Sequence, residues 1–211
     1  MEAGRRLKMN RLEFFEMIPA MGWADRQRVQ WAYALGKKWH KDQIRDSGIR
    51  YFEHVRGVAT ILIEYGYSDA EHLVRAILHD APEDTTIPVS MLEQLFGSEA
   101  TRDILFLCKT YGIEDPRTGF VIPSPKRSPR EYFAGIKLAG KRVVVVKCAD
   151  RIYNLSDLTG DVPAGSRWTP AKRLKQAAET RRWIIPLARE FEPRFAEKLD
   201  FQCTLIELRV R

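Results

Sequence analysis

The stretch "KRVVVVKCADRIYNLSDL", residues 141–158, decides the fold class. Its four consecutive valines, residues 143–146, favour a β-strand by local propensity. Continued through Leu155, however, the same pattern places apolar residues along one face of a helix, with Asp150 embedded in that face. The sequence offers no second convincing strand with which residues 143–146 would pair. We therefore predict a helix here and an all-α fold.

Helical periodicity dominates the rest of the chain as well. The sequence predicts helices over residues 25–39, 51–66, 68–80, two shorter segments within 87–112, 130–140, 169–188 with a bend near Pro186, and a further segment over 191–208. Residues 40–50 and the proline-rich residues 112–129 are predicted loops. We predict a single-domain helical bundle over residues 1–165, with a C-terminal helical extension over residues 166–211 that packs on the same domain.

Length and composition suit one domain with a sizeable core, since the chain has 211 residues and 45% hydrophobic content. No apolar run approaches the roughly 18 residues of a membrane span, and the N-terminus lacks the apolar core of a secretory signal. Three cysteines, Cys108, Cys148 and Cys203, are far apart and show no metal-binding or redox spacing. We predict reduced core cysteines, a cytoplasmic location and no membrane partner.

The charge balance is basic, with 35 Lys and Arg against 28 Asp and Glu, a net charge of +7 and a pI near 9.4. Such an excess suits an anionic partner, for example a nucleotide, an RNA or an acidic surface. The basic residues concentrate in short patches, including "PSPKRSPR" and "AKRLKQ". Any one patch is equally well explained as an ordinary solvated surface.

Polar residues suited to metal binding lie on or beside the predicted apolar helix faces: His54, the adjacent pair His79-Asp80, and Asp150. A buried carboxylate without a partner costs several kcal/mol, and one divalent metal ion would satisfy all four side chains. Two imidazoles and two carboxylates suit Mn²⁺ or Fe²⁺, with Zn²⁺ and Mg²⁺ as alternatives. Taken singly, each His is also explained as a hydrogen-bonded core residue and each Asp as a cap or ion-pair partner.

Four stretches in this order resemble the motifs of HD-domain hydrolases of the RelA/SpoT type, specifically the single-domain small alarmone hydrolases. They are "RDSGIRYFEHVRGVATIL" (45–62), "AILHDAPEDTT" (76–86), "LEQLFG" (92–97) and "VVKCADRIYN" (145–154). The resemblance covers roughly residues 25–158. It implies an all-helical fold and one metal ion, commonly manganese. By motif position, its ligands are His54, His79, Asp80 and Asp150.

The same resemblance implies hydrolysis of (p)ppGpp, the alarmone of the stringent response, at its 3′-diphosphate. Glu83 and Asp84 match the family's Glu-Asp dyad, which orients the attacking water and manages protons. Arg45, Lys147 and Asn154 match positions that face the nucleotide, where Arg45 is placed to stack on a purine or to meet a phosphate. The partner is then a phosphorylated purine nucleotide, nucleic acid is not expected, and a functional pairing with an alarmone synthetase is plausible.

Some positions depart from the family pattern. Asp46 stands where a second basic residue is usual, Val55 replaces a proline, and Ala81-Pro82 replace two aliphatic residues. These changes leave the metal set intact and bear on nucleotide specificity. Two alternatives stay open: an HD-type phosphatase acting on nucleoside 5′-monophosphates or NADPH, and a non-enzymatic basic helical module that binds RNA or protein. The complete Glu-Asp dyad argues against the non-enzymatic module, since a structural metal site needs no base.

Overall fold

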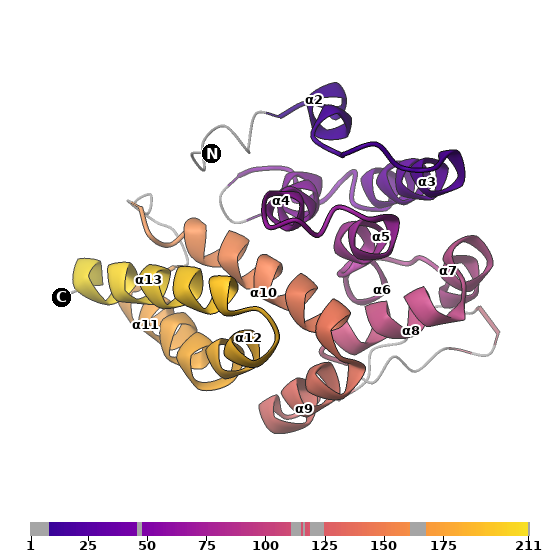
Figure 1. Ribbon diagram of the computed structural model, residues 1–211. Helices are drawn as coiled ribbons and strands as arrows, with labels where there is room; N and C mark the ends of the chain where they lie inside the picture. Colours follow the sequence, from indigo (N-terminus) through magenta and orange to yellow (C-terminus); the bar gives the residue numbers. More distant parts are fainter. Residues whose placement is uncertain are drawn as a thin grey trace.

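The computed structural model describes residues 9–45, 48–110, 115, 117–118, 125–160 and 168–210, and within them it contains helices and isolated β-bridges but no strand (Figure 1). The helices are α2 (Arg11–Glu16), α3 (Trp23–Trp39), α4 (Tyr51–Glu64), α5 (Ala70–Leu78), α6 (Ala81–Asp84), α7 (Val89–Phe96), α8 (Ser98–Leu107), α9 (Pro129–Ala139), α10 (Lys141–Ser156), α11 (Pro170–Glu179), the π-helical turn η1 (Thr180–Ile184), α12 (Ile185–Phe191) and α13 (Pro193–Val210). The predicted all-α fold is confirmed.

Helix α10 is the central element of the fold. It contacts α4, α5, α8, α9, α12 and α13. Figure 1 shows it running between α4 and α5 on one side and the C-terminal helices α11, α12 and α13 on the other. All four valines, 143–146, are buried. A helix with neighbours on most sides is apolar over most of its surface. Burial therefore explains the valine run, and tertiary packing overrides its strand propensity.

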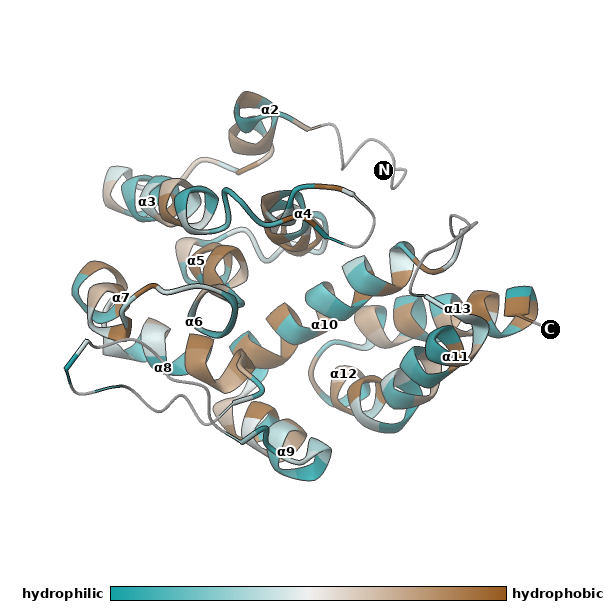
Figure 2. Cartoon of the chain, turned by 180° about the vertical axis from the view of Figure 1, so that it is seen from behind, coloured by the Kyte–Doolittle hydropathy of each residue, from teal (hydrophilic) through white to brown (hydrophobic). Residues whose placement is uncertain are grey.

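Helix α4 lies against α5 and α10, and every residue from Phe52 to Leu62 is buried. Figure 2 shows α4 and α5 as mostly hydrophobic, whereas α11 at the periphery is mostly hydrophilic. Gly57 lets α4 and α10 approach closely, because a Cβ atom there would collide with the ring of Tyr153. This close approach brings His54 on α4 toward Asp150 on α10.

Asp69 caps the start of helix α5, since its side chain accepts a hydrogen bond from the His72 N–H at 3.0 Å. The helix ends at Leu78, two residues before the predicted end. Pro82 then lies in the first turn of the short helix α6, where its missing N–H costs no hydrogen bond. The chain therefore turns immediately after His79 and continues as a separate helical turn.

The C-terminal helices α11 and α12 both pack on α13, and α12 and α13 also pack on α10. The predicted bend near Pro186 takes the form of the π-helical turn η1, directly before α12. The boundary predicted at residues 165/166 falls within 161–167, outside the described residues, so the division into two parts stays a prediction. Most of the predicted loop over residues 112–129 also lies outside the described part, as do Asp46 and Ser47.

Two further sequence predictions concern the core and the membrane. Cys108, Cys148 and Cys203 are free and buried, as predicted. Within the described segments, no helix is long and apolar enough to cross a bilayer.

Candidate metal centre and active site

Four side chains from three parts of the fold meet at the junction of α4, α5 and α10. His54 comes from α4, His79 is the C-cap of α5, Asp80 follows it, and Asp150 comes from α10. The side chains of His54, His79 and Asp150 are buried, and that of Asp80 is 18% exposed. The structure thus brings together all four residues that the sequence singled out, across nearly one hundred positions of chain.

The ligand-type atoms of these residues surround one point. The Nε2 atom of His54 lies 3.5 Å from Oδ2 of Asp80 and 3.4 Å from Oδ1 of Asp150. The Nε2 atom of His79 lies 3.0 Å and 3.8 Å from the same two oxygens. Donor atoms separated in this way suit a shared ion with bonds of about 2 Å. The arrangement could therefore hold a metal ion.

The orientation of His79 also fits a metal ligand. Its Nδ1 atom lies 2.7 Å from the carbonyl oxygen of Ala76, which accepts a hydrogen bond from the Nδ1–H. The opposite nitrogen, Nε2, is buried and has no hydrogen-bond partner. A backbone carbonyl that fixes the tautomer and leaves Nε2 free is the usual second partner of a ligating histidine.

Electrostatics favour a cation at this point. Burial lowers the pKa of His79, but Asp80 and Asp150 outweigh that effect and raise it to about 10. Burial raises the pKa of Asp150, but the Lys147 ammonium, with Nζ 2.7 Å from Oδ2, helps to hold it well below its usual range. The two carboxylates are therefore charged, and a divalent ion would take the place of the His79 proton.

The two acidic residues of α6 have different surroundings. The Tyr51 hydroxyl lies 2.7 Å from Oδ2 of Asp80 and 2.7 Å from Oδ2 of Asp84, so it bridges a candidate ligand and the dyad. Burial and the charge of Asp80 raise the pKa of Asp84. Glu83 accepts a hydrogen bond from the backbone N–H of Lys109 at 3.0 Å. Asp84 is thus linked to the four ligand-type side chains through Tyr51, and Glu83 precedes it on α6.

Sequence reasoning missed Tyr51. The sequence feature that could have identified Tyr51 is its position three residues before His54, because residues three apart on a helix are neighbours. The aromatic rings of Tyr51 and His54 are 5.6 Å apart and edge-to-face.

Two of the predicted nucleotide-facing residues form a chain to the centre. Arg45 donates to Oδ1 of Asn154 at 2.8 Å, and Asn154 donates to Oδ1 of Asp150 at 2.6 Å. The Arg45 guanidinium also lies 5.8 Å and 5.6 Å from the ring centroids of Tyr51 and Tyr153. Aromatic and polar contacts therefore hold Arg45 one residue away from the candidate ligand Asp150.

Lys147 is placed differently from Arg45 and Asn154. It is buried, and its ammonium bonds to Asp150 at 2.7 Å. This contact orients a candidate ligand. A direct role of Lys147 in substrate binding stays a prediction.

The helical fold and the His-His-Asp cluster define an HD domain, a class of domain that binds a divalent metal ion. The HD domain family matches residues 32–115. The chain is also 31% identical over 162 residues to the zebrafish (Danio rerio) guanosine-3′,5′-bis(diphosphate) 3′-pyrophosphohydrolase MESH1, covering 76% of this chain and 81% of that protein. The chain therefore belongs to the MESH1 family of HD-domain proteins of the RelA/SpoT type.

Other relatives are longer. The bifunctional (p)ppGpp synthase/hydrolase SpoT of Escherichia coli (strain K12) is 33% identical over 165 residues, and the match spans 77% of this chain but 21% of SpoT. The chain thus covers about a fifth of that relative. A solved structure of a metazoan ortholog of SpoT that hydrolyses ppGpp superposes with a TM-score of 0.67 at 24% identity, covering 90% of this chain and 97% of the other. This likeness confirms the fold.

Proposed function

We propose that this protein is a metal-dependent (p)ppGpp 3′-pyrophosphohydrolase, which uses water to remove the 3′-diphosphate and releases pyrophosphate. The observation that carries the proposal is the convergence of His54, His79, Asp80 and Asp150 beside the dyad of α6. Family membership supports it, because MESH1 and SpoT are named for hydrolysis of the same nucleotide.

In this proposal, His54, His79, Asp80 and Asp150 hold one divalent ion. The mixed nitrogen and oxygen set favours Mn²⁺, with Fe²⁺, Zn²⁺ and Mg²⁺ as alternatives. When bound, the ion supplies Lewis-acid activation and neutralises negative charge on the phosphoryl group. The orphaned Nε2 of the buried His79 is the feature of the chain that fits such an ion.

The protein's own residues then place water and move a proton. Asp84, held by the Tyr51 hydroxyl, is positioned to accept a proton from the attacking water, and its raised pKa makes it a stronger base. Glu83 is held by a hydrogen bond from the backbone N–H of Lys109, and in this proposal its carboxylate orients the same water. The water oxygen bonds to the phosphorus attached to the 3′-oxygen, the bond from that phosphorus to the 3′-oxygen breaks, and the 3′-oxygen leaves on the nucleoside as a hydroxyl that receives the proton taken up by Asp84.

Arg45 and Asn154 are the proposed substrate contacts. The guanidinium of Arg45 offers a planar cation that stacks on a purine or pairs with a phosphate. A guanosine nucleotide is the first choice, because the named activities of the relatives concern one. An adenosine alarmone, NADPH or a nucleoside monophosphate are the competing substrates. The cytoplasmic location and the pairing with an alarmone synthetase stay predictions.

Product analysis tests the proposal. The purified protein with Mn²⁺ is incubated with ppGpp, pppGpp, ppApp, NADPH and deoxynucleoside monophosphates, and the released pyrophosphate and orthophosphate are measured separately. We expect pyrophosphate from ppGpp or pppGpp. Release of orthophosphate from monophosphates alone would replace the proposal with the phosphatase alternative. The Asp80→Asn variant, prepared in parallel, controls for a contaminating hydrolase.

A further inference from the structure

A second pocket opens between α2, α3 and α4, with a cavity volume of about 500 Å³. Ligand pockets for small molecules usually span roughly 300–1,000 Å³, so a nucleotide-sized molecule fits. The wall is formed by Met9, Asn10, Arg11, Tyr33, Lys37, His40, Lys41, Arg50, Phe52, Glu53 and Arg56. It includes none of the residues assigned above to the metal centre, the dyad or the nucleotide.

The pocket is strongly cationic. Five of its lining residues are basic, Arg11, Lys37, Lys41, Arg50 and Arg56, and one, Glu53, is acidic. Glu53 pairs with both Arg50, at 3.4 Å, and Arg56. One carboxylate facing five cations leaves a formal excess of positive charge, and a concave wall focuses such a field.

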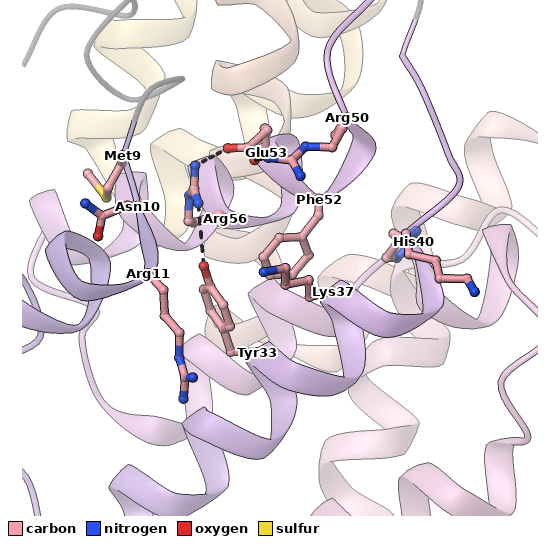
Figure 3. Close-up of a pocket in the computed structure, with 11 residues that line it drawn as sticks. Met9, Asn10, Arg11, Tyr33, Lys37, His40, Arg50, Phe52, Glu53 and Arg56 are labelled. Atoms are coloured by element: carbon pink, nitrogen blue, oxygen red, sulfur yellow. Dashed lines mark hydrogen bonds and ion pairs between the residues drawn. The ribbon is translucent and has the colours of Figure 1, made fainter.

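Two buried lining groups have unsatisfied polar atoms. Arg56 is 6% exposed, and its Nε atom has no hydrogen-bond partner. His40 is fully buried and its Nε2 atom likewise has none, but its Nδ1 donates to Oε1 of Gln43 at 2.7 Å, so Nε2 is an acceptor and only Arg56 offers an unpaired donor. Figure 3 shows Arg11 and Lys37 on either side of Tyr33, whose hydroxyl lies 3.5 Å from the Arg56 guanidinium. A buried donor without a partner costs roughly 1–3 kcal/mol, which an acceptor-rich ligand would relieve.

The pocket is separate from the metal centre. Phe52 and Arg56 are each two positions from His54 on α4, and a step of two residues turns a helix by about 200°. The pocket therefore lies behind α4, whereas His54 faces α10. The two sites touch at His40, whose ring stacks on Tyr51 at 4.9 Å between centroids.

We propose that this pocket is a second ligand site, which binds a small molecule carrying a diphosphate group. Guanidinium groups pair with phosphate oxygens through two parallel hydrogen bonds, and three of the five cations here are arginines. Free pyrophosphate and the diphosphate of a nucleotide present the same chemistry. The volume accommodates either one. The proposal goes beyond the hydrolase function and does not depend on it.

Calorimetric titration tests this site in the full-length Asp80→Asn variant with chelator present, so that no metal-dependent binding at the active site contributes. Pyrophosphate and GDP are titrated separately. We expect binding of at least one of them with a dissociation constant below about 1 mM. Tighter binding of GDP would identify a nucleotide as the ligand class, and equal binding would identify the diphosphate alone. Absence of heat with both ligands would overturn the proposal.

Charge reversals on two walls locate the binding. Adding Lys37→Glu or Arg11→Glu should weaken it at least tenfold, because each removes an attraction and adds a repulsion. Lys38→Glu is the matched control, since Lys38 is exposed on the same helix but does not line the pocket. Arg45→Gln controls for residual binding at the metal centre. Binding lost with Arg45→Gln but kept with Lys37→Glu would place the ligand at the active site and sink the proposal.

Discussion

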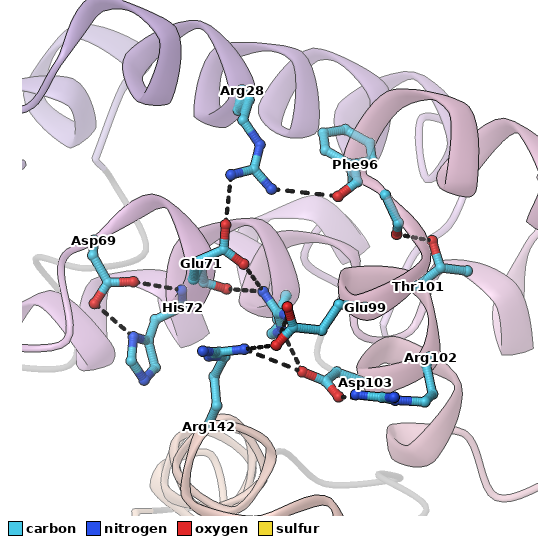
Figure 4. Close-up of polar contacts among 12 residues, drawn as sticks. Arg28, Asp69, Glu71, His72, Phe96, Glu99, Thr101, Arg102, Asp103 and Arg142 are labelled. Atoms are coloured by element: carbon cyan, nitrogen blue, oxygen red, sulfur yellow. Dashed lines mark hydrogen bonds and ion pairs between the residues drawn. The ribbon is translucent and has the colours of Figure 1, made fainter.

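Two polar clusters of this protein, each with a buried centre, differ in how their charge is balanced. The Arg75 cluster comprises the ion-paired residues Arg28, Glu71, Arg75, Glu99, Asp103 and Arg142, and Figure 4 labels all of them except Arg75. Arg75 is fully buried, and it donates to Asp103 at 2.8 Å and to Glu71 at 2.6 Å. Arg142 reaches Glu99 at 2.6 Å and Asp103 at 3.7 Å. Three arginines thus face three carboxylates, and the cluster ties α3, α5, α8 and α10 together.

The metal-centre cluster of His54, His79, Asp80 and Asp150 is not balanced in this way. Its one fixed cation within bonding distance among the described residues is Lys147, which serves Asp150. The remaining charge is compensated by a proton on His79, because Asp80 and Asp150 outweigh burial and raise the pKa of that imidazole to about 10. The comparison teaches that a cluster whose positive and negative charges balance fixes structure, whereas one with an excess of buried carboxylate charge has room for an external cation.

The largest expected effect is a loss of metal binding and turnover when the metal-centre cluster is changed. Asp80→Asn should abolish metal retention and lower hydrolysis by more than about 10⁴-fold, or about 5 kcal/mol of barrier, because the ion loses a ligand. Metal content after dialysis and turnover are the measurements. The fold should remain, as followed by circular dichroism. A variant that keeps full activity in chelated buffer would refute the site.

Glu83→Gln should keep the metal and lose about 10²-fold of turnover, because the attacking water loses the carboxylate that orients it. Metal stoichiometry and kcat are measured together. Glu93→Gln makes the same change at an exposed position of α7 and should leave kcat unchanged. Loss of the metal in Glu83→Gln would mean that Glu83 is a ligand instead.

A change in the Arg75 cluster should lower the stability of the protein and leave its metal content unchanged. Arg75→Met should lower the free energy of unfolding by about 3 kcal/mol, because it removes the hydrogen-bonded partner of the buried Asp103 and leaves it only the more distant Arg142 and Arg102. Denaturant unfolding measures this. Arg102→Met removes a 67% exposed arginine 3.9 Å from Asp103 and should cost about 0–1 kcal/mol. Equal costs for the two variants would contradict the structural role of Arg75.

The smallest expected effect is that of Tyr51→Phe, about tenfold in kcat, because one hydrogen bond is lost. The Tyr51 hydroxyl lowers the pKa of Asp84, while burial and Asp80 raise it. Its removal raises that pKa further, so the acidic limb of the pH–rate profile should move to higher pH. Tyr67→Phe loses a hydrogen bond to Glu192 far from the centre and should leave the profile in place. A fixed acidic limb in Tyr51→Phe would exclude the positioning role.

Much of the fold was predictable, because the apolar pattern around Asp150 continues beyond the valine run and outweighs local propensity. Other helices are too short to show a helical period in the sequence. Helix α2 has six residues and was missed, although its capping box, Asn10 with Glu13, is readable in the sequence. Helix α6 has four residues and depends on the turn at Pro82.

The candidate site was predictable as far as its residue types and motif order reach. The contacts of Tyr51 were not, because they join residues 29 and 33 positions apart through packing of α4 against α5 and α6. The Arg75 cluster was hidden for the same reason. Charged residues at ordinary helical spacing do not reveal which of them become buried together.

The most direct test of the central claim is a crystal structure of the protein with Mn²⁺, with anomalous data collected at the manganese edge. The account predicts one peak within about 2.0–2.3 Å of Nε2 of His54, Nε2 of His79 and a carboxylate oxygen each of Asp80 and Asp150. A peak bound elsewhere, or one that lacks both His54 and Asp150 among its ligands, would contradict it.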